Sequence, residues 1–219
     1  MQYYTPGSVN TPPMTTTTRS NSSRERILAC AETVILQKGF SGTSIEDILE
    51  KSAITKGGFF YHFDGKAGLA EALIHRYLEN DDLLFDRLID QAAELSEDPL
   101  HRLLIFLKLL SDELGKMSQT HPGCLVASFT YESQQFRENI RELIREGMVR
   151  WRQMIVRQLE QVDADYEAKT EVTQETLADM FTAIIEGGIM LTRNFDNNQL
   201  LVNQILAYRS FIRLLYGVS

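Results

Sequence analysis

Apolar residues recur at helical spacing along most of this 219-residue chain. The first clear segment begins near Ser23 and places five of them on one helix face: Ile27, Leu28, Ala31, Val34 and Ile35. Gly39 follows where a helix commonly ends. No later segment has a convincing strand pattern. The periodicity therefore predicts an all-α protein.

Interruptions of this pattern divide the chain into three expected domains. Residues 1–22 are rich in Thr, Pro and Ser, and they predict a disordered arm. Residues 23–68 have the pattern of short helices, and residues 69–219 form a larger helical domain. A long helix should begin at Lys66 and run to about residue 94. Further helices are expected near 99–117, 124–134, 136–161, 173–195 and 198–216.

Cysteine content and apolar run length favour a cytoplasmic protein. Cys30 and Cys124 are the only cysteines, which does not suggest a disulfide framework. No run approaches the roughly eighteen apolar residues that a membrane helix needs. The N-terminus lacks the basic-then-apolar order of a signal peptide.

The net charge of −8 is unevenly distributed. Residues 1–66 hold seven basic and six acidic residues, whereas the remainder holds fifteen basic and twenty-four acidic ones. A nearly neutral N-terminal part can bind DNA if its basic side chains share one face, and phosphates would repel the acidic remainder. The charge permits DNA binding without establishing it.

Two short helices joined by a tight turn are expected between residues 43 and 63. Thr43 and Glu46 have the spacing of a capping box at the start of the first. The pattern then breaks, and Thr55 is a good N-cap for a second helix that ends at Phe63. Such a pair, with a third helix packed across it, is the helix-turn-helix arrangement that reads DNA.

The second of these helices has an unusual composition for a solvated surface. Phe59 and Phe63 lie four residues apart and should face the core. The outward set is then Lys56, Gly57, Gly58, Phe60, Tyr61 and His62. Each interior glycine costs a helix roughly 1 kcal/mol relative to Ala, so the pair indicates either a close approach by DNA or a loosened turn. Lys66, at the next helix start, has the position of a phosphate contact.

Residues 24–70 closely resemble the DNA-binding head of TetR-family transcriptional regulators. The matching features are Ile27, Ala31, Gly39-Phe40, Thr43, Ile45, Ile48, the run Ala53-Ile54-Thr55-Lys56-Gly57, Phe63 and Lys66. One departure is Phe60, where the family commonly has a tyrosine whose hydroxyl meets a phosphate; Tyr61 or His62 is left to supply that contact. The predicted DNA-binding set is Thr43, Thr55, Lys56, Gly57, Gly58, Phe60, Tyr61, His62 and Lys66.

The resemblance also implies an effector pocket and dimerisation through the last two long helices. Two apolar seams at helical spacing support such a pair, with Gly187-Gly188 allowing close approach. The expected dimer interface comprises Phe181, Ile184, Gly188, Leu191, Ile205, Tyr208 and Ile212. The same seams would also suit a core within one chain.

Large or adaptable side chains on the middle helices are candidates for the pocket. They are Phe106, Leu110, Met117, Cys124, Phe129, Met148, Trp151 and Met154, with Met190 as a further candidate. Cys124 stands at a helix N-terminus, where the helix dipole lowers a thiol pKa. This suggests sensing of oxidants or electrophiles, and the alternative is an inert, buried thiol. Cys30, among core residues, should be structural.

The function that these features predict is a dimeric repressor of palindromic operator DNA, released by a small-molecule effector of unknown identity. An activator with the same helix-turn-helix and a redox sensor acting through Cys124 are alternatives. A helical enzyme is a further one, although the four histidines lack metal-ligand spacing and no phosphate loop or nucleophile elbow is present. We expect no cofactor, no metal and no membrane partner.

Overall fold

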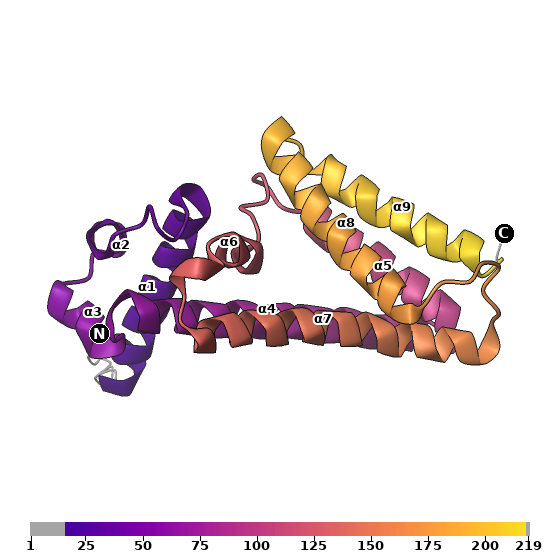
Figure 1. The fold of residues 1–219 in the computed structure, drawn as a ribbon, viewed down its shortest axis with the longest axis horizontal. Coiled ribbons are helices and arrows are strands. Elements are labelled where there is room, and N and C mark those ends of the chain that lie inside the picture. The colour runs from indigo at the N-terminus through magenta and orange to yellow at the C-terminus, as the bar shows by residue number, and fades with distance from the viewer. Residues whose placement is uncertain (1–15, 218–219) are drawn as a thin grey trace, which may run out of the picture.

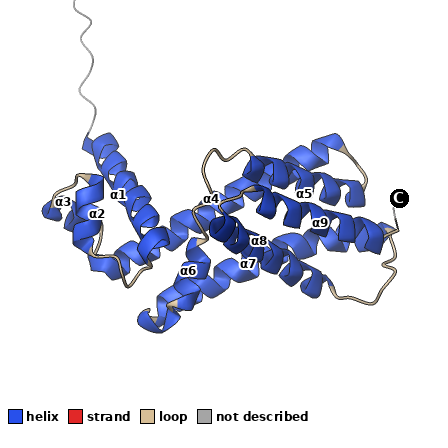
Figure 2. Ribbon diagram, turned by 90° about the horizontal axis from the view of Figure 1, so that it is seen from above, coloured by secondary structure: helices blue, strands red, loops and turns tan. Residues whose placement is uncertain are grey.

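The computed structural model describes residues 16–217, and within that range the chain is helical without strands (Figures 1 and 2). The elements are α1 (Thr16–Lys38), α2 (Ile45–Ser52), α3 (Lys56–His62), α4 (Gly65–Leu95), α5 (Pro99–Gly115), α6 (Leu125–Tyr131), a 3₁₀ turn (Ser133–Gln135), α7 (Glu138–Asp165), α8 (Gln174–Phe195) and α9 (Gln199–Leu215). The predicted all-α fold is confirmed.

The first three helices form a head at one end of the molecule, and α4 runs from it into a body made by the later helices (Figure 1). α7 lies beside α4 along the length of the body, and α5, α8 and α9 pack above them. The predicted body helices agree with these bounds to within a few residues. The largest difference is α7, which continues to Asp165 instead of residue 161.

The first helix begins earlier than the sequence predicts. It starts at Thr16 instead of Ser23, so residues 16–22 are helical and not part of a disordered arm. Extending a helix already formed by Ile27 and Leu28 costs much less than starting a new one, because each added residue gains a backbone hydrogen bond. The rest of the predicted arm, residues 1–15, lies outside the described residues.

The capping box of α2 is shifted by one residue from its predicted position. Ser44 is the N-cap: its hydroxyl accepts from the Asp47 backbone N–H at 3.0 Å, and the Asp47 carboxylate accepts from the Ser44 N–H at 2.8 Å. Thr43 lies in the preceding loop instead, where its hydroxyl donates to the Gly39 carbonyl at 2.7 Å. This fixes the loop between α1 and α2.

The two apolar seams of α8 and α9 face the core of their own chain. Phe181, Ile205, Tyr208 and Ile212 are buried, and Gly188 packs against Leu201. The Tyr208 hydroxyl donates to the Leu177 carbonyl at 2.9 Å and joins the two helices. The dimer interface predicted at these positions is therefore wrong for Phe181, Gly188, Ile205, Tyr208 and Ile212, and only Ile184 and Leu191 stay partly exposed.

Candidate functional site

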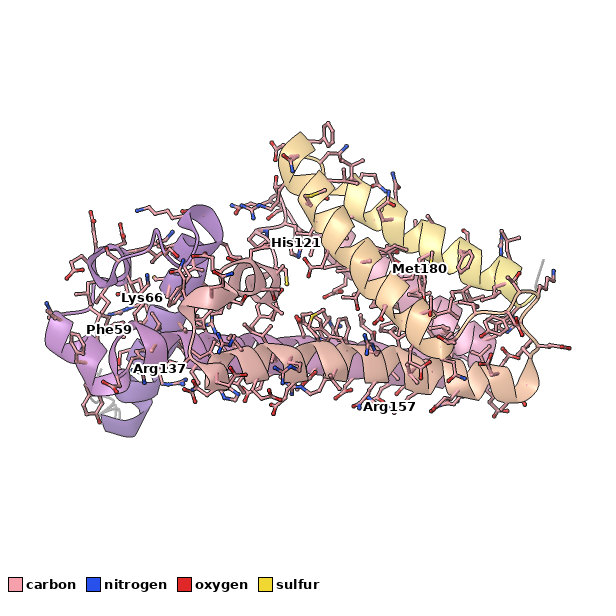
Figure 3. The ribbon with its side chains drawn as sticks, viewed as in Figure 1. Phe59, Lys66, His121, Arg137, Arg157 and Met180 are labelled. Carbon is pink, nitrogen blue, oxygen red and sulfur yellow. The ribbon has the colours of Figure 1, made fainter. Side chains whose placement is uncertain are left out.

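The α2–α3 pair has the geometry of a rigid helix-turn-helix. The turn is made at Ala53, whose φ of 52° lies in the left-handed region. Thr55 then caps α3, and its hydroxyl accepts from the Gly58 N–H at 3.2 Å. Phe59 is fully buried in the head (Figure 3) and Phe63 nearly so, which confirms the predicted inner face.

The opposite face of α3 is exposed over much of its length. Tyr61 is 76% exposed and Phe60 is 49% exposed. The Lys56 side chain is also exposed, with its ammonium 3.9 Å from the Glu46 carboxylate. An exposed aromatic pair beside a lysine can contact both base edges and phosphates.

Two residues of the predicted DNA-binding set are not on this exposed face. Thr43 is 1% exposed and bonded within its loop, so it cannot reach DNA from this position. His62 is half-buried, and its Nε2 lies 2.8 Å from the Ser23 hydroxyl of α1. This contact ties α3 to α1, so that the outward residues are presented on a braced helix.

The two glycines of α3 have different physical roles. A Cβ at Gly57 would meet nothing within 4 Å, so the protein itself does not require glycine there. A Cβ at Gly58 would lie 2.9 Å from the Ile54 Cγ2 and 3.3 Å from the Thr55 hydroxyl. Gly58 therefore serves the turn, and only Gly57 leaves space for an outside partner.

Lys66 stands at the first turn of α4, as expected, but its ammonium is occupied. It donates to the Phe40 carbonyl and lies 4.3 Å from the centre of the Phe40 ring. Burial lowers the Lys66 pKa from its usual value. The ammonium is therefore not free in this structure, because the side chain turns inward to satisfy a loop carbonyl.

The loop after α1 is bound by a carboxylate from the body. Glu132, just beyond α6, accepts from the Phe40 N–H at 2.7 Å, the Ser41 N–H at 2.8 Å and the Ser41 hydroxyl. Burial favours a higher Glu132 pKa, but these hydrogen bonds and the nearby Lys66 outweigh it and lower the pKa. Gly39 is required here because its φ is +77° and a Cβ would lie 2.9 Å from the carboxylate.

A second feature is a cavity of about 80 Å³ inside the body. It lies among α4, α5, α7, α8 and the start of α6, and its lining is mainly apolar with a few polar groups: Tyr77, Asp81, Leu84, Phe85, Leu110, Leu114, His121, Cys124, Trp151, Phe181, Thr182, Ile185, Glu186 and Ile189. An open groove between α6 and α8 shares Cys124, Glu186 and Ile189 with it. The cavity thus has a mixed lining and adjoins an open groove.

Comparison with known families assigns both parts of the chain. Residues 27–73 match the family model for bacterial regulatory proteins of the tetR family, and residues 99–207 match the tetracyclin repressor-like C-terminal domain. The chain belongs to the TetR family. It is a DNA-binding transcriptional regulator, in a class of proteins that are not enzymes.

Individual relatives agree with this assignment. The transcriptional regulator AcuR of Cereibacter sphaeroides is 27% identical over 157 residues, which cover 71% of this chain and 69% of AcuR. The regulator LmrA of Bacillus subtilis is 27% identical over 176 residues, covering 80% and 89% of the two chains. A TetR-family regulator from Agrobacterium tumefaciens shares the fold with a TM-score of 0.74 and 21% identity, over 90% of this chain and all of that one.

In this TetR-family regulator the cavity contains only part of the predicted pocket. Leu110, Cys124 and Trp151 line it. Phe106 is buried behind it against the Phe85 and Phe181 rings, and Phe129 packs instead with Phe40 and Phe136 at the head. Three of the predicted methionines are on the outside or in another groove: Met117, Met148 and Met154. Met190 is 58% exposed.

Cys124 does not have the activated thiol that its helix position suggested. It is the N-cap of α6, and its sulfur accepts from the Ala127 N–H at 3.4 Å. Burial, together with the adjacent Glu186 carboxyl, raises the Cys124 pKa well above its usual value. Desolvation therefore outweighs the helix dipole, and the regulator keeps this sulfur as a thiol at neutral pH.

Several residues of the site were missed from the sequence. Glu132, Asp81 and Glu186 resemble the many acidic residues of solvated helix faces, and nothing in their spacing marks them. Tyr77, by contrast, follows the apolar period of α4 and could have been included. In residues 16–217 no helix is both long and apolar enough to cross a membrane, and no three His, Cys, Asp or Glu side chains form a group that could hold a metal ion.

The glycine pair gives a direct test of the DNA-facing surface. Gly57→Ala should leave the head folded, with a thermal midpoint equal to or above that of the wild type, because Ala is the better helix former. It should weaken operator binding at least tenfold, because its methyl occupies the space left for DNA. Gly58→Ala is the matched variant, and it should instead lower the midpoint by clashing with Ile54. Circular dichroism and fluorescence anisotropy measure the two effects; full operator affinity in Gly57→Ala would refute a close approach there.

Proposed function

We propose that this regulator is a repressor that binds palindromic operator DNA as a homodimer and is released by a small-molecule effector. The observation that carries the DNA-reading part is the outer face of α3, on which Lys56, Gly57 and Tyr61 are exposed. The match of the C-terminal part to a domain described as tetracyclin repressor-like supports repression over activation. The head would end near residue 68, inside α4, and the body would comprise the rest.

The DNA contacts we assign follow from exposure. The residues that would lie against the major groove or its edge are Thr55, Lys56, Gly57 and Phe60. The Tyr61 hydroxyl would donate a hydrogen bond to a phosphate. Tyr61 is favoured for that role over His62, whose ring is bound to Ser23. Phe60 has no hydroxyl and would contact a thymine methyl or sugar.

The dimer would form through the outer faces of α8 and α9. On each helix this face is adjacent to the apolar seam that packs in the core. On α8 this face carries Met180 (Figure 3), Ala183, Gly187 and Met190. On α9 it carries Ala207, Phe211 and Leu214. A Cβ at Gly187 would meet nothing within 4 Å, which leaves room for a second helix to approach. Exposed apolar side chains along two adjacent helices are typical of a helix-bundle interface.

The route from effector to DNA would be α6. Cys124 at its N-terminus lines the cavity, and Glu132 just past its C-terminus holds the loop of the head. Arg193 of α8 adds a second connection by donating to the Leu36 carbonyl of α1 at 3.0 Å. An effector that favours a shifted position of α6 would favour dimers whose two α3 helices no longer fit the half-sites, which is a population shift.

The proposed interface predicts that a charge at Met190 separates the dimer. Met190→Glu should sediment as a monomer at about 10 µM and lose operator affinity at least tenfold, because a charged carboxylate would have to leave water on entering an apolar interface. Leu83→Glu is the matched control, since Leu83 is 69% exposed on α4, away from this face. Analytical ultracentrifugation measures the oligomeric state. A Met190→Glu variant that remains dimeric would contradict the proposed interface.

Salt dependence distinguishes the two lysines of the DNA-binding head. On a palindrome from upstream of its own gene, Lys56→Gln should bind more weakly and lower the slope of log affinity against log salt by about 0.9, as expected for one lost phosphate contact. Lys66→Gln should keep the wild-type slope, because its ammonium is bound to Phe40. Equal slopes for Lys56→Gln and the wild type, or no binding to any upstream palindrome at low salt, would count against the proposed function.

A further inference from the structure

The body cavity combines aromatic walls with two carboxyl groups that lack a counter-charge. Tyr77, Phe85, Trp151 and Phe181 supply the aromatic rings, and the carboxyls are those of Asp81 on α4 and Glu186 on α8. Within residues 16–217 neither carboxyl takes part in a salt bridge, and no Lys or Arg lines the cavity. Such a cavity suits a positively charged guest.

Electrostatics around the cavity favours a cation over an anion. Burial raises the Asp81 pKa to about 7, with further contributions from the charges of Asp82, Glu186 and Glu32. Burial also raises the Glu186 pKa. The other titratable groups of the lining offer no compensating charge: Tyr77 and Cys124 are neutral, and burial together with Arg193 lowers the pKa of His121. A bound cation would stabilise both carboxylates, whereas an anion would face two acidic groups.

The tryptophan indicates a second feature of the guest. Trp151 is 8% exposed, and its indole Nε1 has no hydrogen-bond partner. A buried donor left unpaired costs free energy, so an oxygen atom on the guest would have a ready partner there.

We propose that this cavity binds a small alkylammonium compound that carries an oxygen acceptor, with the ammonium between Asp81 and Glu186. The assignment rests on the proposed function, in which this cavity is the effector site. The volume of about 80 Å³ limits the buried part to a few non-hydrogen atoms. A longer substituent would leave past Cys124 and Glu186 into the adjoining groove.

Three small molecules of nearly the same shape but different charge test whether the cavity prefers a cation. 1-Amino-2-methyl-2-propanol is the cation, 2-methyl-1,2-propanediol its neutral counterpart and 2-hydroxyisobutyrate its anionic one. Trp151 is the only tryptophan of the chain, so its intrinsic fluorescence reports on the cavity directly. The cation should change that fluorescence saturably and bind at least tenfold more tightly than either counterpart. Equal binding of the diol, tightest binding of the anion, or no saturable change with the cation would overturn the proposal.

Proton linkage gives a second readout. The amine stays protonated between pH 6 and 8, whereas Asp81, with its pKa raised to about 7, carries a proton at the lower end. The cation must displace that proton, so its affinity should rise about fivefold from pH 6 to 7 and about twofold more from pH 7 to 8, and level off above that. An affinity that falls with rising pH would contradict the assignment.

Matched variants locate the ammonium. Asp81→Asn and Glu186→Gln should each weaken the cation at least tenfold, and Asp81→Asn should also flatten the pH profile. Asp90→Asn is the control, because Asp90 is an exposed carboxyl of α4 that neither lines the cavity nor contributes to the Asp81 pKa. Unchanged binding in both cavity variants would overturn the proposal.

Operator release is measured apart from binding, so the two proposals can fail separately. If the cation binds with this pattern but leaves operator affinity unchanged, the cavity assignment stands and the effector role fails. If a different molecule releases the operator while the cation leaves Trp151 fluorescence unchanged, the effector role stands and the cavity assignment fails.

Discussion

The arrangement of this protein depends on one carboxylate bound by a loop of the head. Glu132 receives two backbone N–H groups and a hydroxyl from Phe40 and Ser41, and it does so only because Gly39 leaves space for it. Hydrogen bonds to a charged acceptor are stronger than those between neutral groups. The Phe40, Phe129 and Phe136 rings pack beneath this contact, with centres 4.6–5.2 Å apart. This junction joins head and body beside the continuous α4 and the Arg193–Leu36 hydrogen bond.

The same short helix connects this junction with the cavity. α6 has only seven residues. If a guest displaces its N-terminus, so short a helix cannot bend enough to take up the movement, and Glu132 at its other end moves as well. Packed interiors transmit such shifts because they are dense and poorly compressible. In this account the effector acts on the orientation of a rigid α3, and the local structure of the DNA-reading face is preserved.

The sequence predicted the helices better than it predicted their partners. Apolar periodicity and helix breakers locate each helix, but they do not reveal what a helix face packs against. The apolar seam of α9 that contains Tyr208 is predicted to form a dimer interface, whereas in the structure it lies in the core of its own chain. Lys66 and Cys124 were placed at the right helix termini, yet tertiary contacts and desolvation reversed their expected chemistry. Asp81 and Glu132 could not be found, because an acidic residue becomes distinctive only when distant segments bury it.

The most direct test of the contact between Glu132 and the Phe40–Ser41 loop compares operator affinity at two half-site spacings. The wild-type dimer should bind its operator much more tightly than a version whose half-sites are moved apart by one base pair. Glu132→Ala should reduce that ratio at least tenfold while its helix content is retained, because the heads are no longer held at one angle. Glu138→Ala, which removes an exposed carboxylate paired with Arg141, is the control and should keep the wild-type ratio. An undiminished spacing preference in Glu132→Ala would contradict the account.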